Sequence, residues 1–322
     1  MKTLGCCDRT EDPNGLPRFE LIDGPCPICD STDYSPLGFR GGEAHRYHLG
    51  RKVLIARCSS CTHVYPKPMP QLVDTGEGYG SADEYFRYHD SSDEVRRSIR
   101  VLERLRRFGA QSRLLDVGSG RGWLLHAAET LGFSAMGVET SAAFADAAWR
   151  DYGVRVVAKP LHEARFPDSS FDVITLDAVL EHVYRPVELL GEITRVLAPG
   201  GIVWFEVPND GSLYCSFAER YAKLQHADWS AHLSPTFEPY HVQGFTIRSA
   251  CLALRRVGLD PIGVRTLRGS VLPVRPSSLR QRLELRAEYL VHLLARMFPR
   301  KSFNLEVIAK KQPFPTRNGI SC

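Results

Sequence analysis

The chain has 322 residues, of which 43% are hydrophobic, and its 41 lysines and arginines nearly balance 37 acidic residues to give a formal net charge of +4. This composition is that of a folded globular protein, and the modest charge excludes a dedicated nucleic-acid binder with a strongly basic face. No run approaches the roughly 18 apolar residues of a membrane span, and the first residues lack the apolar segment of a secretory signal. We therefore expect a cytoplasmic, reducing location.

Four cysteines stand in a pattern near the N-terminus. After residues 1–20, whose Asp, Pro, Asn and Gly favour a loose tail, Cys26-Pro-Ile-Cys29 and Cys58-Ser-Ser-Cys61 form two C-x-x-C pairs. In a reducing location such pairs are typical of metal ligands, and four thiolates in a closed tetrahedral site suit structural zinc. A redox pair and unpaired buried thiols are the alternatives. We predict a small zinc-binding module over residues 21–70. Metal binding would supply free energy for the folding of this module.

A connector and a helix link this module to the rest of the chain. A Pro- and Gly-rich connector lies between Met69 and Ser81, and residues 71–112 hold most of it and the helix that follows. Ala82 to Phe108 carries apolar residues at helical spacing with arginines between them. Arginines in this arrangement are typical of the solvated face of an amphipathic helix, and contact with RNA is the rarer alternative.

A glycine-rich loop, Gly118-x-Gly120-x-Gly122, follows a strand that we predict over residues 113–117. Glycine lets the backbone turn sharply and approach a ligand, and the next helix points free N–H groups at the loop. The third glycine comes one residue too early for a dinucleotide fingerprint, and the lysine of a P-loop is missing. Asp116 suits an ammonium group and repels phosphate. A Gly-rich turn of any α/β protein is the alternative to a cofactor loop.

Apolar strands then alternate with helical segments, including a helix at 245–258. We place the strands near residues 113–117, 135–139, 154–158, 171–176, 201–207, 261–267 and 303–310. The alternation of the first five strands with helices predicts an α/β domain over residues 113–322, with a parallel sheet that has helices on both faces. The last two strands would complete a seven-stranded sheet. Within a helical insertion at about 270–300, the basic amphipathic helix Leu279–Phe298 would pack on the domain or a second subunit, with a membrane surface as the alternative.

Glu139 ends the second of these strands, about 20 residues after the glycine loop, which is the offset at which such folds bind ribose hydroxyls. It is our ribose candidate. A surface glutamate in a strand-to-helix loop is the alternative.

Three motifs together resemble the class I S-adenosylmethionine-dependent methyltransferases. They are Asp116-x-Gly118-x-Gly120-x-Gly122, the segment Ser170–Val183 with its Leu-Glu-His-Val end, and the segment Ile193–Asn209 with Pro-Gly-Gly before a strand. The two cysteine pairs resemble the zinc module that precedes such domains in bacterial small-molecule and saccharide biosynthesis. The resemblance implies a Rossmann-like fold, S-adenosylmethionine as cofactor and a set of contact residues: Tyr85, Asp116, Gly118, Ser119, Gly120, Gly122, Glu139, Thr140, Leu161 and Asp177.

One stretch departs from that resemblance. Many members carry an acidic residue near the adenine after the third strand, whereas Val157–Ala164 here reads Val-Ala-Lys-Pro-Leu-His-Glu-Ala. Leu161 and His162 are then the candidates for contact with the adenine.

Histidines are the candidates for handling the acceptor's proton. A hydroxyl acceptor must lose its proton during methyl transfer, and a positioned histidine can accept it. His182, in the Leu-Glu-His-Val motif, is the first candidate, and His232 and His241 are alternatives within the aromatic stretch 225–243. For each of them, a histidine that only orders its loop is the competing interpretation.

The sequence thus predicts a methyltransferase for a small-molecule substrate, with a hydroxyl of a secondary metabolite or saccharide as the favoured acceptor. C-methylation of a keto-sugar nucleotide, methylation of ribosomal RNA and a non-catalytic cofactor-binding protein are the alternatives. A homodimer stays open, whereas the modest charge speaks against a nucleic-acid partner.

Overall fold

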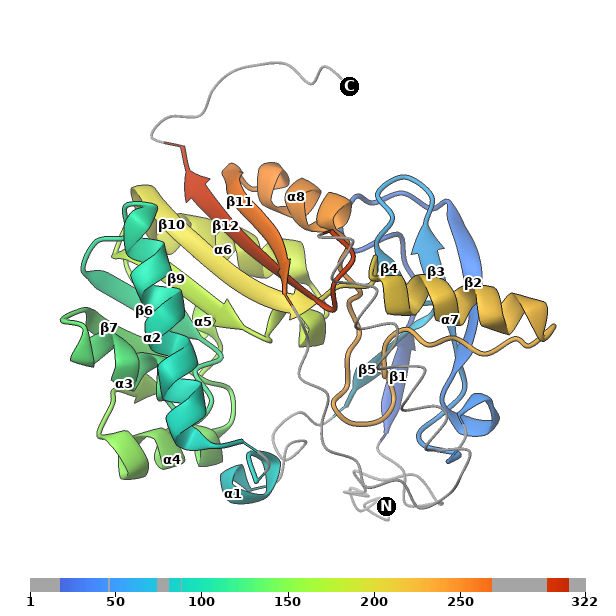
Figure 1. Cartoon of the computed structure of the whole chain (residues 1–322), viewed down its shortest axis with the longest axis horizontal. Coiled ribbons are helices and arrows are strands. Elements are labelled where there is room, and N and C mark those ends of the chain that lie inside the picture. Colours follow the sequence, from blue (N-terminus) through green and yellow to red (C-terminus); the bar gives the residue numbers. More distant parts are fainter. Residues whose placement is uncertain (1–17, 46, 74–80, 88, 268–299, 313–322) are drawn as a thin grey trace, which may run out of the picture.

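The computed structural model describes residues 18–45, 47–73, 81–87, 89–267 and 300–312 (Figure 1). Most of the predicted tail and the whole predicted helix Leu279–Phe298 lie outside the described residues. Phe19 and Glu20, which we assigned to the tail, begin the first strand.

A seven-stranded sheet lies at the centre of the larger part of the molecule, as predicted. Its strands follow the spatial order β11-β12-β10-β9-β6-β7-β8. In chain order they are β6 (Arg113–Val117), β7 (Ser134–Val138), β8 (Val156–Val157), β9 (Phe171–Asp177), β10 (Leu197–Pro208), β11 (Leu259–Leu267) and β12 (Asn304–Lys311).

The five strands β6 to β10 are parallel to one another, as predicted, whereas the last strand runs in the opposite direction. Strand β12 pairs antiparallel with both β10 and β11, so the sheet is mixed. Strands β11 and β12 follow each other in the chain and pair directly. A parallel pair would require a crossover back to the other end of the sheet, whereas an antiparallel neighbour does not.

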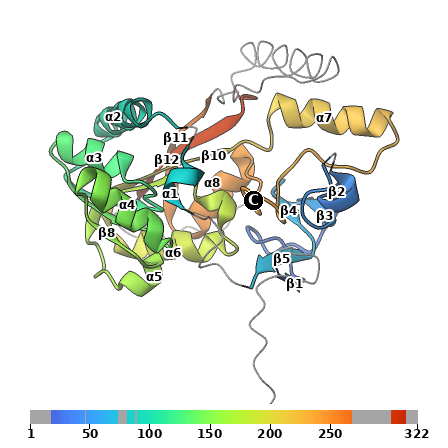
Figure 2. The ribbon, with the colours of Figure 1, turned by 90° about the horizontal axis from the view of Figure 1, so that it is seen from below.

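Helices cover both faces of the sheet (Figures 1 and 2). On one face the core contains side chains of α2 (Ser91–Arg107), α3 (Trp123–Thr130) and α4 (Ala142–Tyr152), and on the other those of α5 (Leu161–Ala164), α6 (Pro186–Val196) and α8 (Ile247–Arg256). Strand β10 supplies both cores, because successive side chains of a strand point to opposite faces. Ile202 and Trp204 join the first core, and Val203 and Phe205 join the second.

Two helices differ from the sequence prediction. The single helix expected over Ala82–Phe108 is divided into α1 (Ala82–Tyr85) and α2, and the side chain of Asp90 caps α2 by accepting from the Asp93 amide at 3.0 Å. A second helix, α7 (Leu213–Leu224), was not predicted and follows its cap Ser212. An N-cap side chain satisfies an amide that the first turn of a helix leaves unpaired, which fixes where each helix starts.

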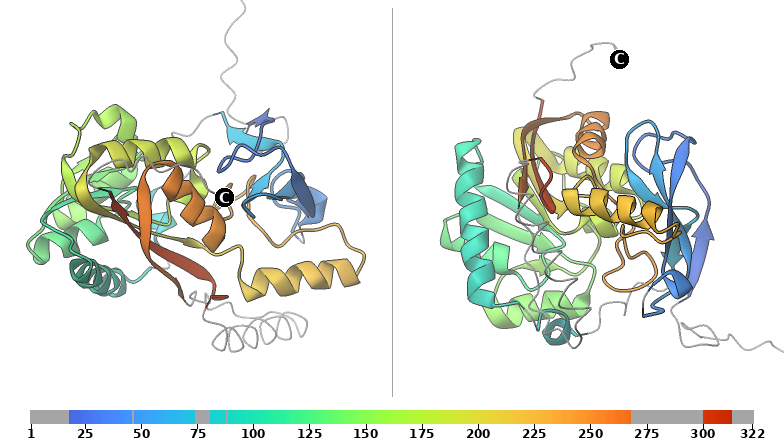
Figure 3. Two further views of the ribbon diagram at one scale, coloured as in Figure 1. Left: turned by 90° about the horizontal axis from the view of Figure 1, so that it is seen from above. Right: turned by 45° about the vertical axis from the view of Figure 1, so that its right-hand side comes forward.

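The N-terminal module is a small β structure that lies beside α7 and α8 in each view (Figures 1, 2 and 3). Its elements are β1 (Phe19–Ile22), β2 (Tyr34–Arg40), a 3-10 turn η1 (Gly42–Ala44), β3 (Val53–Cys58), β4 (Val64–Pro66) and β5 (Met69–Leu72), with β1 pairing β5 and β3 lying between β2 and β4. A backbone bridge joins Val64 to Gly244, and the Arg57 guanidinium binds the Glu219 carboxylate of α7. The module is therefore built against the other part of the chain.

Candidate functional site

The two C-x-x-C pairs come together in the module. All four sulfur atoms lie within 4.8 Å of one another, with Cys26 Sγ 3.5 Å from Cys61 Sγ and Cys29 Sγ 3.5 Å from Cys58 Sγ. Tetrahedral zinc with Zn–S bonds of about 2.3 Å holds its sulfurs about 3.8 Å apart, which agrees with this spacing. The donor set and its spacing fit a zinc ion.

The two pairs also share one backbone shape. Asp30 and Thr62, each directly after the second cysteine of its pair, have φ angles of 60° and 66°. Their amides donate to the carbonyls of Cys26 and Cys58, in both cases at 3.0 Å. His63, the neighbour that could have been a further ligand, instead has its ring nitrogens bound to Gln243 and Ser249.

The glycine loop connects β6 to α3 at the carboxyl end of β6, which lies between β9 and β7 in the sheet. Gly118 and Gly120 have φ angles of 71° and 51°, the left-handed region that favours glycine. A Cβ added at Gly118 would lie 2.6 Å from the Val179 side chain, and one at Gly120 would lie 3.2 Å from the Phe86 ring. The loop therefore has no room for side chains on its inner surface. At Gly122, the corresponding space is filled by Ala148 and Val154, so this glycine serves the packing of α3.

Glu139, at the end of β7, is bound to the glycine loop. Its carboxylate accepts from the amides of Gly120 and Ser141, both at 2.9 Å, and its neighbour Thr140 donates to the same group at 3.4 Å. The side chain of Ser119 lies beneath the loop, and its buried hydroxyl has no hydrogen-bond partner among the described residues. The ribose candidate thus lies next to the loop, as the strand order requires.

Buried carboxylates gather at the same edge of the sheet. Burial and the negative charges of Asp177 and Glu139 raise the pKa of Asp116 to about 8, although the Thr175 hydroxyl donates to it at 2.7 Å. Like charges disfavour ionisation of one another in a low dielectric, and a cation relieves this cost. The edge therefore fits a ligand that carries positive charge, such as the sulfonium and ammonium groups of S-adenosylmethionine.

Asp177 takes part in an ion-pair network. Arg97 of α2 binds Asp177 and also donates to Glu206 of β10 at 2.7 Å. This arginine attaches α2 to the edge that holds the glycine loop.

Among the cofactor candidates, Leu161 lies apart, because its side chain is buried in the core beside α6, while His162 is exposed.

Aromatic side chains cover the glycine loop. Phe86 and Trp123 pack with ring centroids 5.0 Å apart, and Phe144 lies 5.1 Å from Phe86. Tyr85 packs on Phe144 at 5.2 Å, and burial together with the carboxylates of Glu181, Glu238 and Glu139 raises the pKa of its hydroxyl. Tyr85 is thus part of this cover, and Phe86 is the member that sequence reasoning missed.

Two of the three candidate histidines meet. The rings of His182 and His241 have centroids 4.8 Å apart, although 58 residues separate them in the chain. His182 belongs to the 3-10 turn η2 (Leu180–His182), and the carbonyl of Glu181 accepts from the amides of Val242 at 2.8 Å and Gln243 at 3.0 Å. Burial lowers the pKa of His182 to about 4 and that of His241 to about 3, so both imidazoles are neutral at pH 7.

His232 lies in a different environment. Its side chain is fully buried, with one ring nitrogen against Asp210 and the other 2.8 Å from Glu219. Glu219 also accepts from Arg57, and these partners together lower its pKa to about 2. Both nitrogens of His232 are therefore occupied, and it links α7 to the module without reaching the pair of histidines.

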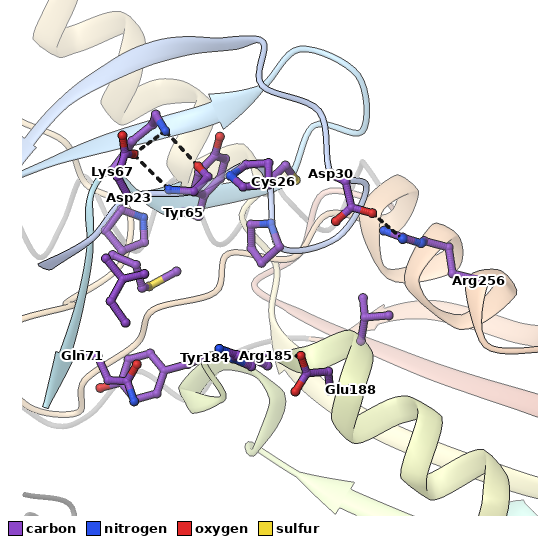
Figure 4. Close-up of a pocket in the computed structure, with 17 residues that line it drawn as sticks. Asp23, Cys26, Asp30, Tyr65, Lys67, Gln71, Tyr184, Arg185, Glu188 and Arg256 are labelled. Atoms are coloured by element: carbon purple, nitrogen blue, oxygen red, sulfur yellow. Dashed lines mark hydrogen bonds and ion pairs between the residues drawn. The ribbon is translucent and has the colours of Figure 1, made fainter. Parts of the chain in front are cut away.

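A separate pocket of about 460 Å³ lies between the module and the start of α6 (Figure 4). Three ion pairs surround it, Lys67 with Asp23, Arg256 with Asp30 and Arg185 with Glu188. Among the predicted site residues it contains only Cys26. Its charges are paired with one another, so it differs from the carboxylate-rich edge of the sheet.

Several residues of the candidate site and its surroundings were not among our sequence candidates, namely Glu181, Arg57 and Glu219. Glu181 stood in the quoted Leu-Glu-His-Val motif, and a carboxylate inside an apolar run was a usable signal. Arg57 and Glu219 gave no such signal, because 162 residues separate them.

Comparison with known proteins identifies the class. The sequence pattern of the methyltransferase domain family matches residues 87–263, more than half of the chain. Strands β6 to β10, the glycine loop and Glu139 belong to the same region. The chain is thus a member of this family, the S-adenosylmethionine-dependent methyltransferases of class I.

Individual relatives agree with this class. The ubiquinone biosynthesis O-methyltransferases of Methylococcus capsulatus and Paraburkholderia phymatum are 33% and 36% identical over 106 and 104 residues, which are 31% and 30% of this chain. The chain spans less than half of their lengths, 45% and 44%. A chain in the solved complex of the Haloferax volcanii Trm112 methyltransferase activator with a methyltransferase has a similar fold, with a TM-score of 0.51, 17% identity, and coverage of 73% of this chain and 97% of its own.

Among the helices that the structure describes, none has the length and the apolar character that a membrane crossing requires.

Proposed function

We propose that this chain transfers a methyl group from S-adenosylmethionine to a hydroxyl group of a small-molecule acceptor. The observation that carries the proposal is the edge of the sheet where a glycine loop without inner side chains, Glu139 and the buried Asp116 meet. The relatives named as O-methyltransferases support oxygen as the acceptor atom.

The cofactor would be held by residues of this edge. Glu139 would accept from the ribose hydroxyls, the amides of the glycine loop would face the cofactor's polar groups, and Asp116 would lie near its positive charge. Tyr85 and Phe86 would cover it and keep water out. When bound, S-adenosylmethionine supplies an electrophilic methyl carbon, and alignment of the acceptor with this carbon can contribute roughly 7 to 11 kcal/mol to catalysis.

The acceptor would lie on the side of His182 and His241. Both histidines are neutral at pH 7, which is the form in which an imidazole can accept a proton or bind a metal ion. Residues 225–243 would form the acceptor's wall. The module holds this stretch in place through bonds such as Ser230 N to the Phe39 carbonyl at 2.8 Å and the Arg51 amide to Thr236 Oγ1 at 2.9 Å.

The four cysteines would bind one structural zinc ion. All four coordination positions would be filled by thiolates, so the metal would stabilise the module and take no part in chemistry. We therefore expect zinc to act on acceptor binding through the stretch 225–243, and not on cofactor binding.

Calorimetry with S-adenosylhomocysteine tests the cofactor proposal. We expect the wild type to bind and Asp116→Ala to lose at least about tenfold in affinity, or 1.4 kcal/mol. Asp168→Ala, an exposed carboxylate outside the edge, is the matched control. A wild type that shows no binding would refute the proposal. Transfer from a methyl-labelled donor to phenols, saccharides and ribosomal RNA, followed by mass spectrometry of the product, then identifies the acceptor atom.

Metal analysis tests the zinc proposal. We expect about one zinc ion per chain in the wild type and a loss of that ion in Cys26→Ser, while Cys251→Ser, outside the cluster, keeps it. A folded wild type without metal would contradict the assignment.

A further inference from the structure

A second group of metal-ligand side chains lies at the acceptor side. One donor atom each of Glu181, His182 and His241 lies within 4.8 Å of the other two. Metal–nitrogen and metal–oxygen bonds of about 2.0 to 2.2 Å place neighbouring ligand atoms within this range after small side-chain adjustments. The three residues are separate from the four cysteines, and the zinc proposal does not use them.

The carboxylate of Glu181 lacks a partner that its burial requires. Glu181 is 1% exposed, and its Oε2 atom has no hydrogen-bond partner among the described residues. A buried carboxyl oxygen without a partner costs free energy, and buried charges are normally paired or bound to metal. Asp177, Glu206 and Asp210 add negative charge around it. Arg97 is paired with the first two and His232 with the third, but no hydrogen bond from either to Glu181 is found among the described residues.

The backbone fixes the three ligands relative to one another. The Glu181 carbonyl accepts from the amides of Val242 and Gln243, so the residue after His241 is bound to the turn that carries His182. Gln243 also donates to the Val183 carbonyl at 3.0 Å. In addition, the ring of His182 interacts with the carbonyls of Pro239 and Tyr240. A histidine ligand of a metal commonly donates its other ring N–H to a carbonyl in this way.

We propose that Glu181, His182 and His241 bind a divalent transition-metal ion. Two imidazoles and one carboxylate suit Zn²⁺, Fe²⁺, Co²⁺ and Mn²⁺. Three protein ligands leave coordination positions open for water or for an oxygen of the acceptor. A hydroxyl bound to such an ion loses its proton more readily, which is what transfer to oxygen requires. Use of the metal in catalysis rests on the proposed function, whereas its binding does not.

The other buried histidine cluster does not compete with this assignment. Asp210, Cys215 and His232 also lie close together, but both ring nitrogens of His232 are bound by carboxylates. A ring held between two carboxylates offers no free lone pair to a cation. A metal at that cluster would also show the strong sulfur-to-metal absorption of a thiolate ligand.

Titration of the full chain, with zinc in its cysteine site, by Co²⁺ under anaerobic conditions tests the proposal. We expect one further equivalent to bind, with the weak visible bands of nitrogen and oxygen ligands and without a new sulfur band. His241→Ala and the isosteric Glu181→Gln should weaken this binding at least about tenfold. His226→Asn, an exposed histidine of the same stretch, should bind as the wild type does. Circular dichroism and retained zinc establish that the variants are folded.

Two results would overturn the inference. One is a wild type that binds no further Co²⁺. The other is a further Co²⁺ whose affinity and spectrum are the same in folded His241→Ala and Glu181→Gln, because that ion would lie elsewhere. Calorimetry with S-adenosylhomocysteine separates the two proposals: a chain that binds Co²⁺ at this site but not the nucleoside would refute the proposed function alone.

Discussion

Substitution of Gly118 by alanine probes the glycine loop in two ways at once. The left-handed φ of 71° costs an alanine about 1 to 2 kcal/mol. The new Cβ would also lie 2.6 Å from Val179 Cγ2, and such overpacking costs typically about 1 to 3 kcal/mol. Rotation of Val179 away from the new Cβ is itself unfavourable, because a β-branched side chain is restricted in χ1. We expect a total loss of about 2 to 5 kcal/mol in the free energy of unfolding.

Gly132→Ala is the matched control. Gly132 has a φ of 80°, but nothing lies within 4 Å of an added Cβ, so only the cost of about 1 to 2 kcal/mol for the left-handed backbone applies. Denaturant unfolding of both variants isolates the contact with Val179. In a Val179→Ala background, the effect of Gly118→Ala should fall to that of Gly132→Ala. Displacement of the loop should also weaken binding of S-adenosylhomocysteine more than tenfold in Gly118→Ala, and Gly132→Ala should bind normally.

Equal destabilisation in the two variants would refute this reasoning, since it would mean that Val179 does not limit the loop. So would a Gly118→Ala protein that binds the nucleoside with wild-type affinity.

Three further outcomes follow from the site. Glu139→Gln should weaken nucleoside binding by about ten- to a hundredfold, measured by calorimetry, because an amide offers one acceptor where the carboxylate offers two; the exposed Glu129→Gln should not. The affinity for cationic S-adenosylmethionine should rise from pH 6 to pH 8, because the pKa of Asp116 is about 8 and the cation binds its ionised form; an affinity that is flat or falls with pH would contradict this. Chelation of zinc should abolish turnover of the acceptor and leave nucleoside binding unchanged, because the module contacts residues 228–236 and not the glycine loop; equal losses of both would count against it.

Much of the sheet could be predicted from the sequence, for a physical reason. Strand β9 is buried on both faces and is mostly apolar, with Asp172 and Thr175 as polar residues inside it, so its position could be predicted within one residue. The direction of β12 could not be predicted from the sequence, because an apolar strand has the same composition whichever way it runs. Helix α7 was missed because its large apolar side chains, Phe217, Tyr221 and Leu224, are exposed and give no buried stripe.

Some residues of the candidate site could likewise be predicted from the sequence, and others could not. Asp116, Gly118 and Glu139 were accessible because they follow strands at fixed offsets, so local sequence determines which edge they share. The contact between His182 and His241 depends on hydrogen bonds from the amides of Val242 and Gln243 to the Glu181 carbonyl, 61 and 62 positions earlier in the chain. The occupied ring of His232 depends on partners in α7 and after β10. The sequence placed His182 first and did not distinguish His232 from His241. Only their hydrogen bonds distinguish a pair at the acceptor side from one that links the module to α7.

The bridge between Val64 and Gly244 has a consequence for protein engineering. The strand after the second cysteine pair forms backbone hydrogen bonds with the stretch that carries His241, and Gln243 continues this contact to His63. If only residues 225–243 were transplanted between relatives to exchange acceptor specificity, the side-chain contacts of this stretch with the module, such as that of Gln243 with His63, would be lost. The module and this stretch form one exchangeable cassette, and a chimaera that moves both should fold where a loop graft alone should not.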